Sequence, residues 1–228
     1  QNPTARLLAP DKRQRLLDWA ARRDILIVED DPYGSLYFED AASAGETRPL
    51  RADDEDGRVL YLSSFSKTLA PGFRVGWLVA PPSLIERFET AKQSTDLTSG
   101  ILDQHIVYEA VRRGVVARIA PQLRALYQKK RDVMEQSIRQ TLGGRLTWAS
   151  PKGGFFVWAR LPPGCRDMEL LERALQHGVV FVAGSAFFVD GSGHDTIRLS
   201  FSAPSLEGIR EGVSRLATAL EACQTQAR

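Results

Sequence analysis

Two cations, Lys67 and Arg74, lie in the segment 61–77 (YLSSFSKTLAPGFRVGW), where apolar runs give way to a turn. Lys67 follows the apolar run 59–62, and Arg74 precedes the apolar run 75–80. Burial at the end of a strand and a neighbouring cation both favour the neutral amine of a lysine over its charged form. Because a neutral lysine amine can form a Schiff base with a carbonyl compound, this spacing predicts a nucleophilic lysine.

Hydroxyl groups surround the same lysine and could hold an anion. Ser64, Ser66 and Thr68 flank Lys67, and the planar fork of Arg74 suits a phosphate because it forms paired, charge-assisted hydrogen bonds. An amine beside a phosphate cradle indicates a phosphorylated aldehyde, and pyridoxal phosphate is the commonest cofactor of that kind. A sugar-phosphate or P-loop-like site is the alternative, although the glycine-rich spacing of a P-loop is absent from the sequence.

A second polar cluster lies in the segment 28–38 (VEDDPYGSLYF), directly after an apolar run. Open α/β sheets place ligand contacts just beyond the carboxyl ends of their strands. Asp30 could be the anionic partner that keeps a pyridine nitrogen protonated, so that the ring acts as an electron sink. Tyr33 could donate a hydrogen bond to the ring oxygen. For this short segment alone, an acidic surface turn is the alternative.

Helices and strands alternate around these residues. In chain order we expect a helix over 10–23 with Asp11 as its N-cap, strands over 25–28, 59–62 and 75–80, a loop over 40–58 and helices over 83–141. This order predicts an α/β fold with a mostly parallel sheet that is covered by helices.

The pattern changes after Gly143 and Gly144. We expect two strands around Gly153 and Gly154, a helix over 168–177, an apolar run over 179–183, a strand over 196–202 and a helix from Ser205. That last helix carries one apolar face, formed by Ile209, Val213, Leu216 and Leu220. Four aromatic side chains are predicted to be core: Trp148, Phe155, Phe156 and Trp158. Together these elements predict a second, smaller α+β domain.

Composition narrows the functional classes. The 30 basic and 28 acidic residues are interspersed and give a net charge of +2, so no basic stripe indicates a nucleic-acid partner. No apolar run approaches the roughly 18 residues of a membrane span. The two cysteines predict neither a disulfide framework nor a metal cluster, and the histidines lack ligand spacing, so we expect a cytoplasmic protein without a metal site.

Three segments, SFSKTLAPGFRVGW, EDDPYGSLYF and the opening QNPT, resemble the class I/II aminotransferases among the fold-type I pyridoxal-phosphate enzymes. The resemblance is strongest to the subgroup of 2-aminoadipate, kynurenine and aromatic aminotransferases, and it covers the C-terminal portion of that family. It implies that residues 1–130 form the later part of a large cofactor-binding domain and residues 131–228 a small C-terminal α+β domain. Because the chain begins with Gln1 and a helix follows almost at once, we expect the natural polypeptide to extend upstream; a processed or tagged chain with a complete fold is the alternative.

The resemblance implies roles for the residues that match the family's motifs. It assigns cofactor contacts to Asn2 (ring oxygen), Asp30 (pyridine nitrogen), Tyr33 (ring oxygen), Ser64, Ser66 and Arg74 (phosphate) and Lys67 (Schiff base). Arg198, in TIRLSFS, matches the arginine that binds the substrate's α-carboxylate. On residue type alone, Arg198 is a cation entering an apolar strand, so it needs an anionic partner, and a structural salt bridge is the alternative.

The resemblance implies an aminotransferase of amino-acid metabolism that moves an amino group between an L-amino acid and a 2-oxo acid through Lys67, with the intact protein a homodimer. Ala5 departs from the family, which has glycine after QNPT. Neither the family's glycine/serine phosphate loop nor the aromatic residue that stacks on the ring can be assigned in this sequence, so we expect no transamination by these residues alone. The alternatives are another pyridoxal-phosphate reaction (lyase or racemase), a GntR/MocR-type transcription regulator with an aminotransferase-like effector domain, and an inert scaffold.

Overall fold

The structure, a computed structural model, describes residues 1–43 and 45–225 as an α/β protein. The chain divides into two compact units, Leu7–Arg124 and a second that joins Gln1–Arg6 to Ala125–Arg228. The helix α4 (Val115–Leu142) contributes residues to both units. The predicted assignment of residues 1–130 and 131–228 to a cofactor-binding and a small domain remains a prediction. Among the described helices, none has the length and apolar character that a membrane span requires.

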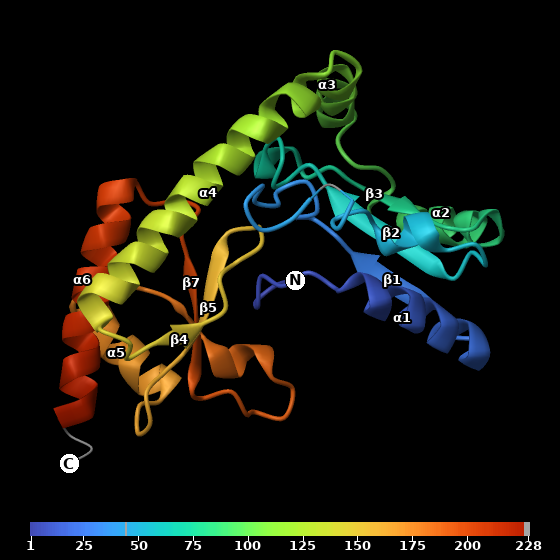
Figure 1. Ribbon diagram of the computed structural model, residues 1–228. Helices are drawn as coiled ribbons and strands as arrows, with labels where there is room; N and C mark the ends of the chain where they lie inside the picture. Colours follow the sequence, from blue (N-terminus) through green and yellow to red (C-terminus); the bar gives the residue numbers. More distant parts are fainter. Residues whose placement is uncertain (44, 226–228) are drawn as a thin grey trace. The chain divides into compact units, whose positions relative to one another are not determined.

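The unit Leu7–Arg124 contains a mixed sheet of β1 (Ile27–Asp30), β2 (Val59–Ser64) and β3 (Gly76–Val79), in that order (Figure 1). The pair β1 and β2 is parallel, whereas β2 and β3 are antiparallel, with Ser64 opposite Gly76. Antiparallel pairing is possible because the connection 65–75 is a turn with one short 3-10 helix, η2 (Pro71–Phe73), and no crossover helix. The carboxyl ends of β1 and β2 and the start of β3 therefore share one edge.

Besides the start of α4, this unit contains the helices α1 (Pro10–Arg23), α2 (Pro82–Asp96) and α3 (Ile101–Arg112). Proline opens both α1 and α2, where its missing N–H costs no hydrogen bond. Asp11, predicted as the N-cap of α1, lies instead in its first turn, since the helix begins at Pro10 and Ala9 is its N-cap. Within the predicted loop 40–58, a short 3-10 helix, η1 (Leu50–Asp53), was not expected.

The other unit contains an antiparallel sheet with the strand order β4-β5-β7-β6. Figure 1 labels β4, β5 and β7 of this sheet. Its strands are β4 (Thr147–Trp148), β5 (Phe156–Arg160), β6 (Val182–Ala183) and β7 (Thr196–Ser200). Two helices, α5 (Asp167–Gln176) and α6 (Leu206–Thr225), contact each other, and a 3-10 helix, η3 (Gly184–Phe187), follows β6 directly. The two strands expected around Gly153 and Gly154 are thus present as β4 and β5.

The core of this unit lies on one face of the sheet. Val157, Ala159 and Ile197 are fully buried, and the apolar stripe predicted for α6 is confirmed: Ile209, Val213, Leu216 and Leu220 are all buried. Of the four aromatic residues predicted as core, only Phe155 is buried; Trp148, Phe156 and Trp158 are half-buried. Strand alternation explains this for Phe156 and Trp158, because Val157 and Ala159 take the core face of β5.

Candidate active site

The predicted nucleophile lies on a compact turn that follows β2. The N–H of Phe65 donates to the carbonyl of Val75 at 3.1 Å, and the N–H of Leu69 donates back to the carbonyl of Phe65 at 2.9 Å. The N–H of Ser66 donates to Ser64 Oγ at 3.3 Å, so the two hydroxyl-bearing residues are adjacent in space. Backbone hydrogen bonds therefore hold the segment that carries Lys67 in one shape.

Arg74 comes to the same edge from the other strand of this hairpin. It ends η2 in the left-handed conformation, with φ of 52°, and its side chain is exposed. Two residues later, a Cβ on Gly76 would lie only 2.9 Å from the carbonyl oxygen of Ser63, so β3 begins in close contact with the end of β2. The rings of Phe65 and Trp77, whose centroids are 4.6 Å apart, also join the two arms of the hairpin.

Lys67 is half-buried rather than buried, and so are Ser64 and Ser66. Within residues 1–43 and 45–225, Lys67 Nζ forms no ion pair and no hydrogen bond. Its amine is thus not committed to a structural salt bridge and can react. One hairpin thus carries an amine, two hydroxyls and a guanidinium, which are groups that suit a phosphorylated aldehyde.

Three successive carboxylates at the end of β1 have different surroundings. Glu29 accepts two backbone N–H bonds from η1, at 2.6 and 2.9 Å. Asp31 accepts a hydrogen bond from the Tyr61 hydroxyl at 3.3 Å, and burial raises the pKa of the Asp31 carboxyl. Asp30 points to the opposite side of the strand, is exposed and has no partner among the described residues. Of the three, Asp30 is the carboxylate that a ligand can reach.

Tyr33 lies half-buried in the turn that follows Asp31. The turn leaves no room at Gly34, where a Cβ would lie 2.3 Å from Asp31 Oδ2. The Tyr33 carbonyl accepts a hydrogen bond from the N–H of Leu36 at 2.8 Å. The backbone that carries Tyr33 is therefore fixed relative to the end of β1.

The predicted carboxylate-binding arginine lies in the other unit, on β7. Arg198 Nη1 donates to Asn2 Oδ1 at 2.7 Å, so these two predicted site residues are in direct contact. The guanidinium carbon is 4.1 Å from the ring centroid of Phe156 and 4.8 Å from that of Phe187. These cation–π contacts fix the plane of the guanidinium.

Backbone hydrogen bonds hold the segment that carries Asn2 against the rest of its unit. The N–H of Ala5 donates to the carbonyl of Gln1 at 2.7 Å, and the carbonyl of Ala5 accepts a hydrogen bond from the N–H of Lys152 at 3.1 Å. Ala5 has φ of 54°, in the left-handed region that favours glycine. The turn thus keeps a conformation suited to glycine although alanine occupies the position.

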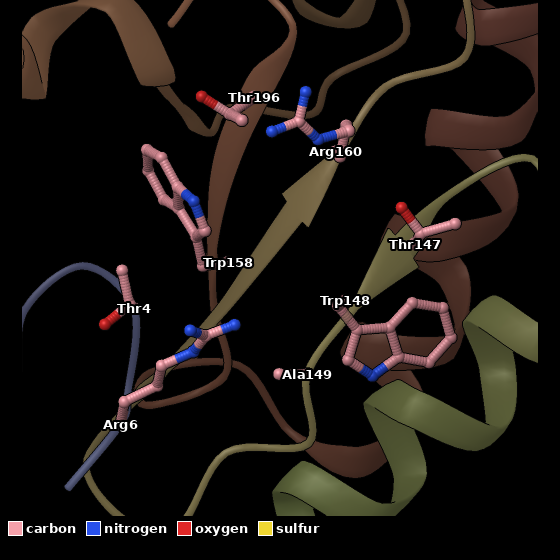
Figure 2. Close-up of a pocket in the computed structure, with 8 residues that line it drawn as sticks. All are labelled: Thr4, Arg6, Thr147, Trp148, Ala149, Trp158, Arg160 and Thr196. Carbon is pink, nitrogen blue, oxygen red and sulfur yellow. The ribbon is translucent and has the colours of Figure 1, made fainter.

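A pocket of about 510 Å³ lies in the same unit as Arg198 (Figure 2). Trp158, which lies opposite Arg198 in the β5–β7 register, is one of its walls. Figure 2 shows that Arg6 enters from the N-terminal segment and Arg160 from β5. The lining residues are Thr4, Arg6, Thr147, Trp148, Ala149, Trp158, Arg160 and Thr196. None of the predicted site residues lines this pocket.

The predicted residues are therefore divided between the two units. Six lie in Leu7–Arg124: Asp30, Tyr33, Ser64, Ser66, Lys67 and Arg74. Asn2 and Arg198 form the second group. Sequence reasoning missed that Phe156 and Phe187 contact Arg198; the signal was the alternation of β5, which places Phe156 on the face opposite Val157. Within the described part of the chain, no cluster of three or more potential ligands could hold a metal ion.

Comparison with known proteins identifies similar chains. The sequence profile of the family described as "Aminotransferase class I and II" matches residues 1–216. The chain is 41% identical over 221 residues to aromatic-amino-acid aminotransferase 1 of Thermococcus litoralis, covering 97% of this chain and 52% of that protein. It is 38% identical to the α-aminoadipate aminotransferase of Thermus thermophilus, solved in complex with N-(5′-phosphopyridoxyl)-L-leucine, with a TM-score of 0.91 over 99% of this chain and 58% of that one.

Some more distant relatives are transcription regulators. An uncharacterized HTH-type transcriptional regulator of Bacillus subtilis is 32% identical over 220 residues, which is 95% of this chain and 43% of the regulator. The chain spans about half the length of the curated aminotransferases that it matches.

Proposed function

Because the chain belongs to the class I and II aminotransferase family, we propose that this protein uses pyridoxal phosphate to move an amino group between an L-amino acid and a 2-oxo acid. The observation that carries the proposal is the hairpin formed by β2, the turn 65–75 and β3. It presents a half-buried amine without a structural partner, Lys67, together with the hydroxyls of Ser64 and Ser66 and the guanidinium of Arg74.

The residues present fit the chemical groups of this cofactor. Ser64, Ser66 and Arg74 would hold its phosphate, since hydroxyls and a guanidinium fork donate hydrogen bonds to an anion. Asp30 is the one carboxylate of its cluster that no structural hydrogen bond occupies, so it would hold the proton on the ring nitrogen. Tyr33 would donate to the ring oxygen.

When bound, pyridoxal phosphate supplies an electrophilic carbon for the amino group and a ring that withdraws electrons from the substrate. Lys67 would hold the cofactor through its amine, and the same amine would accept the proton from the substrate's α-carbon and give it back. Arg198 would bind the α-carboxylate through paired N–H groups, and Asn2 would hold one of its nitrogen atoms in place.

Substrate and assembly form the finer part of the proposal. Relatives named for aromatic amino acids and for 2-aminoadipate support an amino acid and a 2-oxo acid as the substrates. We propose a homodimer that acts in the cytoplasm. The second candidate function is the effector domain of a transcription regulator, which the regulator match over 95% of this chain supports. A helix-turn-helix domain upstream of Gln1 in the natural gene would favour the regulator.

The test is reduction of the cofactor-loaded full-length protein with borohydride, followed by peptide mass mapping. We expect one labelled lysine, Lys67, and we expect Lys67→Arg to remove the label. Lys92→Arg is the matched control, because Lys92 is an exposed lysine that already pairs with Asp96. A label on any lysine other than Lys67 would overturn the assignment.

A further inference from the structure

A fully buried carboxylate, Asp167, lies at the start of α5 and has no part in the proposed chemistry. Asp167 Oδ2 accepts the backbone N–H of Ser185 at 2.9 Å, and Oδ1 lies 3.2 Å from Nδ1 of His194. The N–H of Asp167 donates to the carbonyl of His194 at 2.8 Å. Burying a charge is costly unless such partners compensate for the lost water, so this carboxylate holds its partners in defined positions.

One of those partners belongs to η3. Ser185 is the second residue of η3, so Asp167 fixes the beginning of this short helix. Gly184 allows η3 to pack closely on β7, since a Cβ at this position would lie 2.0 Å from Thr196 Oγ1 and 2.3 Å from the Thr196 carbonyl oxygen. The strand residues just before η3 pair with β7 as well, with Val182 opposite Arg198. The helix is thus attached both to Asp167 and to the strand that carries Arg198.

The last residue of η3 contacts that arginine. The ring of Phe187 lies 4.8 Å from the guanidinium carbon of Arg198, and Trp158 meets the same ring edge-on at 5.4 Å and 89°. Phe156 packs on the guanidinium as well, at 4.1 Å. Since a guanidinium fork recognises a carboxylate only in the right plane, the two phenylalanine rings determine how Arg198 presents its donors.

We infer that Asp167 is a positioning residue for Arg198: its carboxylate holds Ser185, and thereby η3 and the ring of Phe187, against the guanidinium. This inference rests on the proposed role of Arg198 in binding the α-carboxylate. Loss of the acceptor releases the start of η3, and the guanidinium then samples orientations that bind a carboxylate less well.

The direct test is the NMR signal of the Arg198 Nε–Hε group in the full-length protein, assigned with Arg198→Lys. Aromatic rings so close to a guanidinium displace this signal from the position of exposed arginines. We expect Asp167→Ala, which removes the acceptor, and Phe187→Leu to move it in the same direction, toward that position. Asp190→Ala is the matched control, since Asp190 accepts a serine N–H in the same way, from Ser192 at 3.0 Å, but is exposed.

Kinetics give the second readout. For the Asp167→Ala enzyme we expect KM for both the amino acid and the 2-oxo acid to rise about tenfold while kcat changes less than about twofold, because the carboxylate contact exists in the ground state and the transition state alike. A variant that is only less stable would lower the melting temperature without this split. If Asp167→Ala does not fold, Ser185→Pro removes the donor from the other end of the same hydrogen bond.

An unchanged Arg198 signal in folded Asp167→Ala, or an equal change in Asp190→Ala, would overturn the inference. Failure of the proposed function gives a different result: the Arg198 signal would still respond to Asp167→Ala, but Arg198→Lys would leave KM for both substrates unchanged.

Discussion

Replacing Arg198 with lysine tests the proposed substrate site most directly, because the charge stays and only the planar fork is lost. In the structure this fork donates to Asn2 at 2.7 Å and packs on the rings of Phe156 and Phe187. A lysine ammonium is a compact point charge on a flexible chain, so it cannot reproduce the paired hydrogen bonds or the flat contact.

The expected loss follows from these contacts. A hydrogen bond to a charged group contributes about 1.5–3 kcal/mol, and the variant loses one of the two that the fork makes to a carboxylate. A loss of about 2 kcal/mol lowers kcat/KM about 30-fold. The loss should appear mainly in KM, because the carboxylate remains bound throughout the reaction.

The assay is steady-state kinetics of the full-length enzyme with each substrate varied in turn. Both the amino acid and the 2-oxo acid should be affected alike, since they share the carboxylate. Arg160→Lys is the matched control: Arg160 lies on the neighbouring strand, is exposed and pairs with Asp195. An effect confined to one substrate, or an Arg160→Lys variant equally impaired, would refute the reasoning.

Three further predictions concern stability, thiol reactivity and turnover. Gly34→Ala should destabilise the protein by about 1–3 kcal/mol in denaturant unfolding, because the added methyl would overlap the Asp31 carboxylate at 2.3 Å; an unchanged midpoint would contradict this packing. Burial and the neighbouring Cys223 raise the pKa of the Cys165 thiol to about 12. Iodoacetamide should therefore label Cys165 at pH 8 only after unfolding. The neutral thiol's contribution to the free energy of unfolding should be complete below the ordinary thiol pKa of 9.0 and should be lost as the pH rises toward 12. Rapid labelling of the folded protein would contradict both expectations. Lys67→Ala should abolish turnover but leave weak cofactor binding, measured by absorbance titration, through the groups proposed for the phosphate and the ring.

The elements predicted best are those with one apolar and one polar face. The α6 stripe was predicted from spacing alone, because burial of a single helix face leaves a period of about 3.6 residues in the sequence. The apolar run 179–183 shows the limit of this reasoning, since only Val182 and Ala183 pair with β7. The N–H of Val179 instead donates to the Ala174 carbonyl and closes the end of α5, a use of the backbone that an apolar run does not reveal.

Strand faces were harder to predict where both carry apolar residues. On β5, the sequence Phe-Val-Trp-Ala-Arg offers two large rings on one side and two small residues on the other. Size favoured the rings as core, but the structure buries Val157 and Ala159, and Phe156 is left to pack on Arg198. Arg198, on the adjacent strand β7, explains which face of β5 carries the rings, because a guanidinium requires an aromatic or polar neighbour on its own face. Register, which the sequence does not state, was the missing information.

Asp30 illustrates how strand geometry separates structural from reactive groups of one chemical type. Side chains alternate along β1, so Glu29 and Asp31 share a side and the backbone N–H groups of η1 and the Tyr61 hydroxyl engage them. Asp30 falls on the other side by the same alternation. A shift of one residue in the pairing of β1 with β2 would exchange these roles and leave two carboxylates without their partners. The hydrogen bonds of Glu29 and Asp31 therefore fix the register that makes Asp30 accessible to a ligand.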